Sequence, residues 1–112
     1  MRIKSSSSPF GGTGRTRLLL ALRLLSESYP RELARVLAMP FSSVQKALRS
    51  LERDGLVAGR SVGRTRVVRL DPRYFAFDDL QRLLLRLTEP EAELKSRVAA
   101  LRRRPRRTAK PL

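Results

Sequence analysis

The stretch Arg31–Leu70, RELARVLAMPFSSVQKALRSLERDGLVAGRSVGRTRVVRL, changes its periodicity twice. Two helical patterns come first, and Met39–Phe41 separates them because a proline disfavours helix in the residue before it. The second helix should end before Gly55, since glycine is the usual residue after a helix C-terminus. Beyond Gly55 the period falls from 3.6 to 2, which predicts two short strands around a turn in which Gly63 supplies a positive φ. The stretch therefore predicts helix, tight turn, helix and hairpin.

The second of these helices, Ser42–Arg53, has two opposed faces at about 100° per residue. One face is apolar and consists of Val44, Ala47, Leu48 and Leu51. The opposite face carries Ser42, Gln45, Lys46, Arg49 and Arg53, with Ser43 beside them. Arginine and lysine donate to guanine O6 and N7, and glutamine pairs with adenine N6 and N7, so this face suits the DNA major groove. The alternative is an ordinary solvated face of a core helix.

The hairpin is rich in arginine around its turn, at Arg60, Arg64, Arg66 and Arg69. Alternation predicts Arg64 and Arg66 on one side and Thr65 and Val67 on the other. Such a ribbon can follow a DNA backbone or reach into the minor groove, where arginine meets a negative potential. Arginines on a hairpin edge also prevent aggregation, which is the alternative interpretation.

The stretch resembles the winged helix-turn-helix of ArsR/MarR-like transcriptional regulators over roughly residues 16–87. The matching residues are Glu32–Leu33–Ala34, Ser42, Val44, Leu48, Leu51–Glu52, Gly55–Leu56–Val57 and the hairpin arginines. The resemblance implies a mainly α fold with a small β-hairpin, in which a winged helix-turn-helix is followed by one or two C-terminal helices. It also implies that the Ser42–Arg53 helix enters the major groove and that the Arg60–Arg66 wing contacts the adjacent backbone or minor groove.

Two features depart from the family pattern. Ala38–Met39–Pro40 stands where a glycine, an apolar residue and a capping serine or threonine are common. Ala38 must then adopt the backbone conformation that glycine usually supplies, and Ser42 or Ser43 is expected to cap the helix. The metal-sensing members use cysteine or histidine ligands, and this chain has neither, so no metal and no cofactor is expected.

The 112-residue chain has 25 Lys and Arg against 10 Asp and Glu, a formal charge of +15. This excess predicts a polyanionic partner, with nucleic acid favoured over an anionic membrane surface. The alternative is solubility combined with a preference for arginine. Without cysteine or histidine there are no disulfides, imidazole bases or thiolate zinc sites. The longest apolar run, Leu18–Leu22, is too short to span a bilayer, so we expect a cytoplasmic, nucleoid-associated protein without a membrane partner.

The chain divides into four predicted parts. Residues 1–14 are a flexible arm, residues 15–87 the DNA-binding domain, residues 88–101 a C-terminal helix, and residues 102–112 a basic disordered tail. The tail should add non-specific affinity through Arg102, Arg103, Arg104, Arg106 and Arg107. Inside the domain, helices are expected from Thr16 to Ser26, from Pro30 and over Phe77–Leu87.

A homodimer is expected, because inverted-repeat operators are bound by dimers. Its candidate surfaces are the excess leucines Leu19, Leu20 and Leu24 and the helices of residues 77–87 and 94–101. The alternative is that these leucines complete the core of a small monomer.

The main hypothesis is a sequence-specific regulator that binds double-stranded DNA and represses by occluding a promoter. The alternatives are an architectural chromosome-binding protein with little sequence choice and a winged-helix interaction module, for example a partner of a nucleotidyltransferase. An enzyme is the weakest hypothesis, because GGTG lacks the lysine of a phosphate-binding loop. Asp78 and Asp79 are interpreted as structural acids at a helix start.

Overall fold

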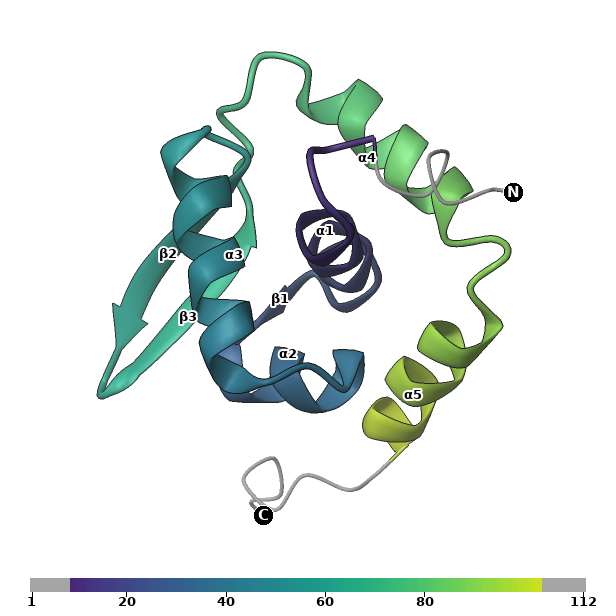
Figure 1. Ribbon diagram of the computed structural model, residues 1–112. Coiled ribbons are helices and arrows are strands. Elements are labelled where there is room, and N and C mark those ends of the chain that lie inside the picture. Colours follow the sequence, from purple (N-terminus) through teal and green to yellow (C-terminus); the bar gives the residue numbers. More distant parts are fainter. Residues whose placement is uncertain (1–8, 104–112) are drawn as a thin grey trace.

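The computed structural model describes residues 9–103, which form a mainly helical fold with one small antiparallel sheet (Figure 1). The elements in chain order are α1 Thr13–Leu25, β1 Glu27–Ser28, α2 Pro30–Leu37, α3 Phe41–Arg53, β2 Val57–Val62, β3 Thr65–Leu70, α4 Phe77–Leu87 and α5 Ala92–Arg103. The predicted order of three helices, hairpin and two helices is confirmed. No helix within residues 9–103 combines the length and the apolar character needed to cross a membrane.

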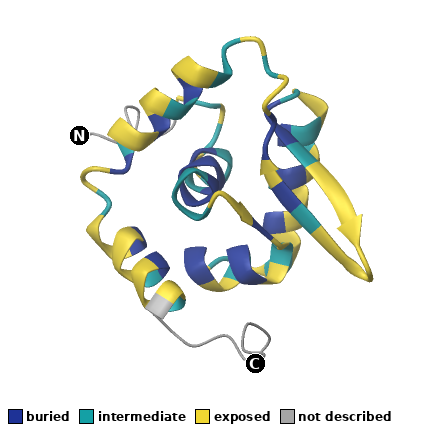
Figure 2. Ribbon diagram, turned by 180° about the vertical axis from the view of Figure 1, so that it is seen from behind, coloured by how far each residue is buried: buried dark blue, intermediate teal, exposed yellow. Residues whose placement is uncertain are grey.

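Helix α1 lies at the centre of the fold, and the other helices and the sheet surround it (Figure 1). Every residue of Leu18–Leu22 is buried, because α1 is apolar nearly all round and packs against α2, α3, α4 and α5 (Figure 2). Leu19 and Leu20 therefore belong to the core of the single chain. The expectation that they form a dimer interface is wrong, and the alternative that they complete the core is confirmed.

The first helix begins earlier than its apolar pattern suggests. Its N-cap is Gly12, and the backbone N–H of Thr16 donates to the Gly12 carbonyl at 3.0 Å. Thr13 and Gly14, which were assigned to the flexible arm, are helical because this bond closes a turn before the leucine stripe starts. Pro9–Gly12 forms a turn, and residues 1–8 of the arm lie outside the described residues.

The turn between α2 and α3 confirms one expectation and corrects another. Ala38 has φ 54° and ψ 46°, the left-handed conformation usually supplied by glycine. Helix α3 begins at Phe41 with Pro40 as N-cap, and the N–H groups of Ser43 and Val44 donate to the Pro40 carbonyl. Neither Ser42 nor Ser43 caps α3, since both lie inside its first turn, beyond the cap position.

The sheet has three strands in the order β1-β3-β2, so the predicted hairpin gains one strand. Strand β1 pairs Ser28 with Val68; with only two residues it is too short to show a period of two in the sequence. The hairpin loop is Gly63–Arg64, and Gly63 has the expected positive φ of 64°. At the end of α3, Gly55 has φ 79° and the N–H of Leu56 donates to the Leu51 carbonyl, which confirms the glycine-terminated helix.

The two C-terminal helices cover α1 from the side opposite the hairpin (Figure 1). Helix α4 has the predicted bounds, and Leu80 and Leu84 are buried whereas Leu83 is 46% exposed. Helix α5 continues to Arg103, so Arg102 and Arg103 are not part of a disordered tail. Their helix persists because its apolar side, including Leu101, packs on the core. The remaining tail arginines, Arg104, Arg106 and Arg107, lie outside the described residues.

Candidate nucleic-acid interface

Helix α3 holds its predicted polar face in solvent. The side buried against the core consists of Val44, Leu48 and Leu51. The six residues assigned to the polar face are all exposed: Ser42, Ser43, Gln45, Lys46, Arg49 and Arg53. Because a buried apolar stripe fixes the rotation of the helix about its axis, this face points away from the protein as a unit.

The cations of this face are free of acidic partners. Within residues 9–103, Lys46, Arg49 and Arg53 make no ion pair and no side-chain hydrogen bond. The two acids at the C-terminal end of α3 are each bound to an arginine from another element. Asp54 pairs with Arg15 at 2.8 Å, and Glu52 pairs with Arg66. The face therefore presents uncompensated positive charge beside neutralised carboxylates.

The predicted hairpin residues do not share one side. In the observed register Arg66 lies opposite Ser61, on the same face as the buried Val68, and this face is turned toward α3. Arg60 lies on the other face, where it pairs with Glu27 of β1 at 3.3 Å. Thr65 has the parity of Arg60, and the exposed Arg64 belongs to the two-residue loop. The separation of Arg66 from Thr65 and Val67 is as predicted; the structure places Arg60 on the far side.

The link between Glu52 and Arg66 was not predicted from the sequence. The two side chains meet above Gly59 of β2, where an added Cβ would lie 2.6 Å from Arg66 Nη2 and 2.9 Å from Glu52 Oε2. A groove of about 250 Å³ runs beside the pair between α3 and the hairpin. Its lining residues are Pro30, Gln45, Leu48, Arg49, Glu52 and Arg66. The sequence signal for this contact is the glycine inside a strand, which often marks a close approach.

Two further arginines extend the basic surface and were also missed. Arg31 and Arg35 are exposed on α2, one helical turn apart. The Arg31 guanidinium stacks 4.2 Å from the centroid of the Phe41 ring, which places it at the start of α3. Arg35 Nη2 donates to the Tyr29 hydroxyl at 3.4 Å. Their spacing on the polar side of an amphipathic helix was the available signal.

Other arginines serve the fold. Arg17 and Arg97 donate to the Leu37 and Val36 carbonyls at the C-terminal end of α2, at 3.2 and 3.1 Å. Arg23 donates to the Gln81 carbonyl at 3.0 Å, and Arg102 donates to the Leu24 carbonyl. Three of these carbonyls, those of Leu24, Val36 and Leu37, lie near helix C-termini, where carbonyls lack partners within the helix. Part of the positive charge counted from composition is therefore structural.

The free positive charge is concentrated around α3. Among the described residues, the exposed cations that bind neither an acid nor a backbone carbonyl are Arg31, Arg35, Lys46, Arg49, Arg53, Arg64, Arg69 and Lys95. All except Arg69 and Lys95 lie on α2, on α3 or in the hairpin loop. Within residues 9–103, most of the unpaired positive charge therefore lies on α2, α3 and the hairpin loop.

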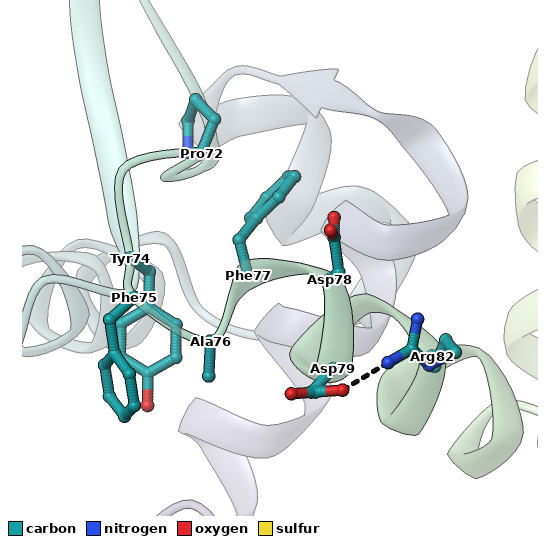
Figure 3. Close-up of a pocket in the computed structure, with 8 residues that line it drawn as sticks. All are labelled: Pro72, Tyr74, Phe75, Ala76, Phe77, Asp78, Asp79 and Arg82. Atoms are coloured by element: carbon teal, nitrogen blue, oxygen red, sulfur yellow. Dashed lines mark hydrogen bonds and ion pairs between the residues drawn. The ribbon is translucent and has the colours of Figure 1, made fainter.

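A second hollow lies at the start of α4 (Figure 3). Its lining includes two carboxylates, unlike the predominantly basic surface of α3. Asp78 and Asp79 point to different sides of the helix, and Asp79 pairs with Arg82. Within residues 9–103 no group of three carboxylate, imidazole or thiol side chains could hold a metal ion. Nearby, hydrogen bonds from the Arg73 guanidinium and backbone N–H lower the pKa of Asp71, which closes the turn after β3.

Comparison of the chain with family models, with curated proteins and with solved structures gives no match.

Proposed function

We propose that this chain is a winged helix-turn-helix protein that binds duplex DNA as a sequence-specific transcriptional regulator. The observation that supports it best is the exposed face of α3, on which the side chains of Gln45, Lys46 and Arg49 have no partner within residues 9–103. The tight turn at Ala38 and the hairpin β2–β3 behind α3 provide the remaining parts of that architecture.

In this proposal α3 lies in the major groove. A helix with its side chains is about 10–12 Å across, and the major groove of B-DNA is about 12 Å wide. Gln45 and Arg49 are on consecutive turns of the exposed face, and we assign them to base edges. Ser42 and Ser43 in the first turn, and Arg31 and Arg35 on α2, are assigned to phosphates. Arg64 in the hairpin loop reaches the adjacent backbone or minor groove.

The proposed regulator represses by occupying promoter DNA, and it does so as a dimer. Since Leu19 and Leu20 are enclosed in the chain, the dimer contact must use other surfaces. Helix α4 offers the exposed Leu83 and Leu85 for this purpose. The oligomeric state is measured by light scattering with and without duplex.

Duplex affinity at several salt concentrations tests the proposal. The full chain is titrated with random duplexes and with a duplex enriched by selection from a random pool. Specific binding about 10³-fold or more tighter than random binding is expected of a regulator. A small ratio would favour the architectural alternative. Salt-insensitive binding to a protein, with no duplex affinity, would favour the interaction module.

Three alanine variants locate the interface. Gln45→Ala and Arg49→Ala should each lower affinity for the selected duplex by about 1–3 kcal/mol and relax its sequence preference. Lys95→Ala is the matched control, because Lys95 is an exposed cation of α5 that forms no ion pair among the residues that the structure describes. Equal losses from Lys95→Ala and Arg49→Ala would show that net charge, and not the α3 face, determines binding.

A further inference from the structure

The ion pair between Glu52 and Arg66 links α3 to the hairpin. Arg66 belongs to β3 and is half-exposed, whereas Glu52 comes from α3 and is three-quarters buried. Without this contact, a flexible arginine at a hairpin edge samples many rotamers in solvent. With it, the guanidinium is held over Gly59 at the groove that Arg49 of α3 also lines.

The donor geometry leaves Arg66 able to bind a second anion. Only Nη2 contacts Glu52, at Oε2, and no other bond to the Arg66 side chain occurs within the described residues. A guanidinium carries five N–H donors in a fixed plane, so Nη1 and Nε remain free. The Glu52 carboxylate can therefore orient Arg66 while Nη1 and Nε remain available to an anion in the groove.

Glycine at position 59 is the independent observation that this contact is specific. Gly59 is not among the positive-φ residues, so its backbone does not require glycine. Glycine inside a strand weakens it, and here its only evident use is the space that the pair occupies. The space that the ion pair needs, and not the backbone of the strand, therefore accounts for glycine at position 59.

We propose that Glu52 is a positioning residue that holds Arg66 toward α3, so that Arg66 receives one backbone phosphate of the duplex at the groove between α3 and the hairpin. The inference rests on the proposed DNA binding and adds to it a defined phosphate site and the residue that orients it. Glu52 lines the same groove, and its carboxylate is neutralised by the bond from Arg66 Nη2, so Nη1 and Nε of Arg66 are the donors left for the phosphate.

Gly59→Ala tests this without changing the charge, because an added Cβ would lie less than 3.0 Å from Arg66 Nη2 and Glu52 Oε2, so the ends of these two side chains must shift. One phosphate contact adds about 0.9 to the slope of log affinity against log salt concentration. That slope makes the contact's contribution to affinity about eightfold larger at 0.1 M salt than at 1 M salt. Gly59→Ala and Arg66→Gln should each lower the duplex affinity by about this factor and reduce the salt slope by about this amount. The double variant should lose no more affinity than Arg66→Gln alone. Ser61→Ala, on the same strand and face, is the control.

A second measurement without DNA separates the pair from the proposed function. ¹⁵N relaxation at Arg66 Nε should report an ordered side chain in the wild type and a mobile one in Glu52→Gln and Gly59→Ala. A mobile Arg66 in the wild type would overturn the positioning role, whatever the chain binds. Wild-type duplex affinity in Gly59→Ala, alongside a loss in Arg66→Gln, would overturn it as well. If the wild type binds no duplex while Arg66 is ordered, the proposed function and the phosphate site fail together, and the pair remains a structural contact.

Discussion

Replacing Ala38 by glycine should stabilise the protein, although glycine usually destabilises. Ala38 has φ 54° and ψ 46° and is exposed, so its methyl group contributes little packing. The left-handed conformation costs an L-residue about 1–2 kcal/mol, and glycine avoids this cost. The greater freedom of glycine in the unfolded chain costs about 0.5–1 kcal/mol. The net gain in unfolding free energy is about 0.5–1 kcal/mol, a two- to fivefold change in the folded-to-unfolded ratio.

Urea and thermal unfolding followed by circular dichroism measure this gain. For a domain of this size the midpoint temperature should rise by about 2–6 °C. The matched control is Ala99→Gly, the same chemical change at an exposed position inside α5. There glycine should lower the unfolding free energy by about 1 kcal/mol, because the backbone is right-handed helical. The two variants are thus expected to shift the midpoint in opposite directions.

Equal destabilisation by both variants would refute the reasoning. It would mean that residue 38 is not left-handed in the folded chain, and the junction between α2 and α3 would then differ from the one described. A stabilised Ala38→Gly variant should also keep the duplex affinity of the wild type, since the substitution leaves the direction of α3 unchanged.

Three other substitutions test separate parts of the structure. Leu19→Ala should lower the unfolding free energy by about 2–5 kcal/mol; a variant as stable as the wild type that instead dissociates in light scattering would place Leu19 at an interface. Arg97→Gln should lower the unfolding free energy by about 1 kcal/mol, because the hydrogen bond to the Val36 carbonyl is lost. Arg82→Gln, at an exposed ion pair, should lower it by less than about 0.5 kcal/mol. Equal losses in urea unfolding would contradict the role of Arg97 as a donor to that carbonyl. The lowered pKa of Asp71 means that its carboxylate stabilises the fold above the unfolded pKa of about 3.9 and ceases to do so as pH falls through the folded value. Asp71→Asn should therefore be less stable than the wild type at pH 7, with a gap that narrows in urea titrations below about pH 4; a constant gap would exclude this linkage.

The order of the elements could be predicted because most of them carry a local signal. The bounds of α4 and the end of α3 before Gly55 follow from apolar spacing and from glycine chemistry. Strand β1 could not be found, because its two residues become a strand only by pairing with β3. The start of α1 was also missed, since the leucine stripe begins several residues inside the helix.

The candidate site was predictable where it depends on one helix and not where it depends on two elements. The α3 face follows from residues 42–53 alone. The position of Arg66 depends on which face of the hairpin turns toward α3, and its partner Glu52 lies 14 residues away. The role of α1 was ambiguous for a related reason. A helix that is apolar nearly all round must be buried on several sides, and its sequence does not show whether the same chain or a second copy buries it.

The central position of α1 affects how the protein is made. It is translated before every element that surrounds it, and its last covering contact, from Arg102 to the Leu24 carbonyl, spans 78 residues. During synthesis the leucines of α1 therefore remain without their final partners until α4 and α5 have left the ribosome. Nascent chains that stop before α5 expose the apolar surface of α1. Such intermediates aggregate unless chaperones bind them.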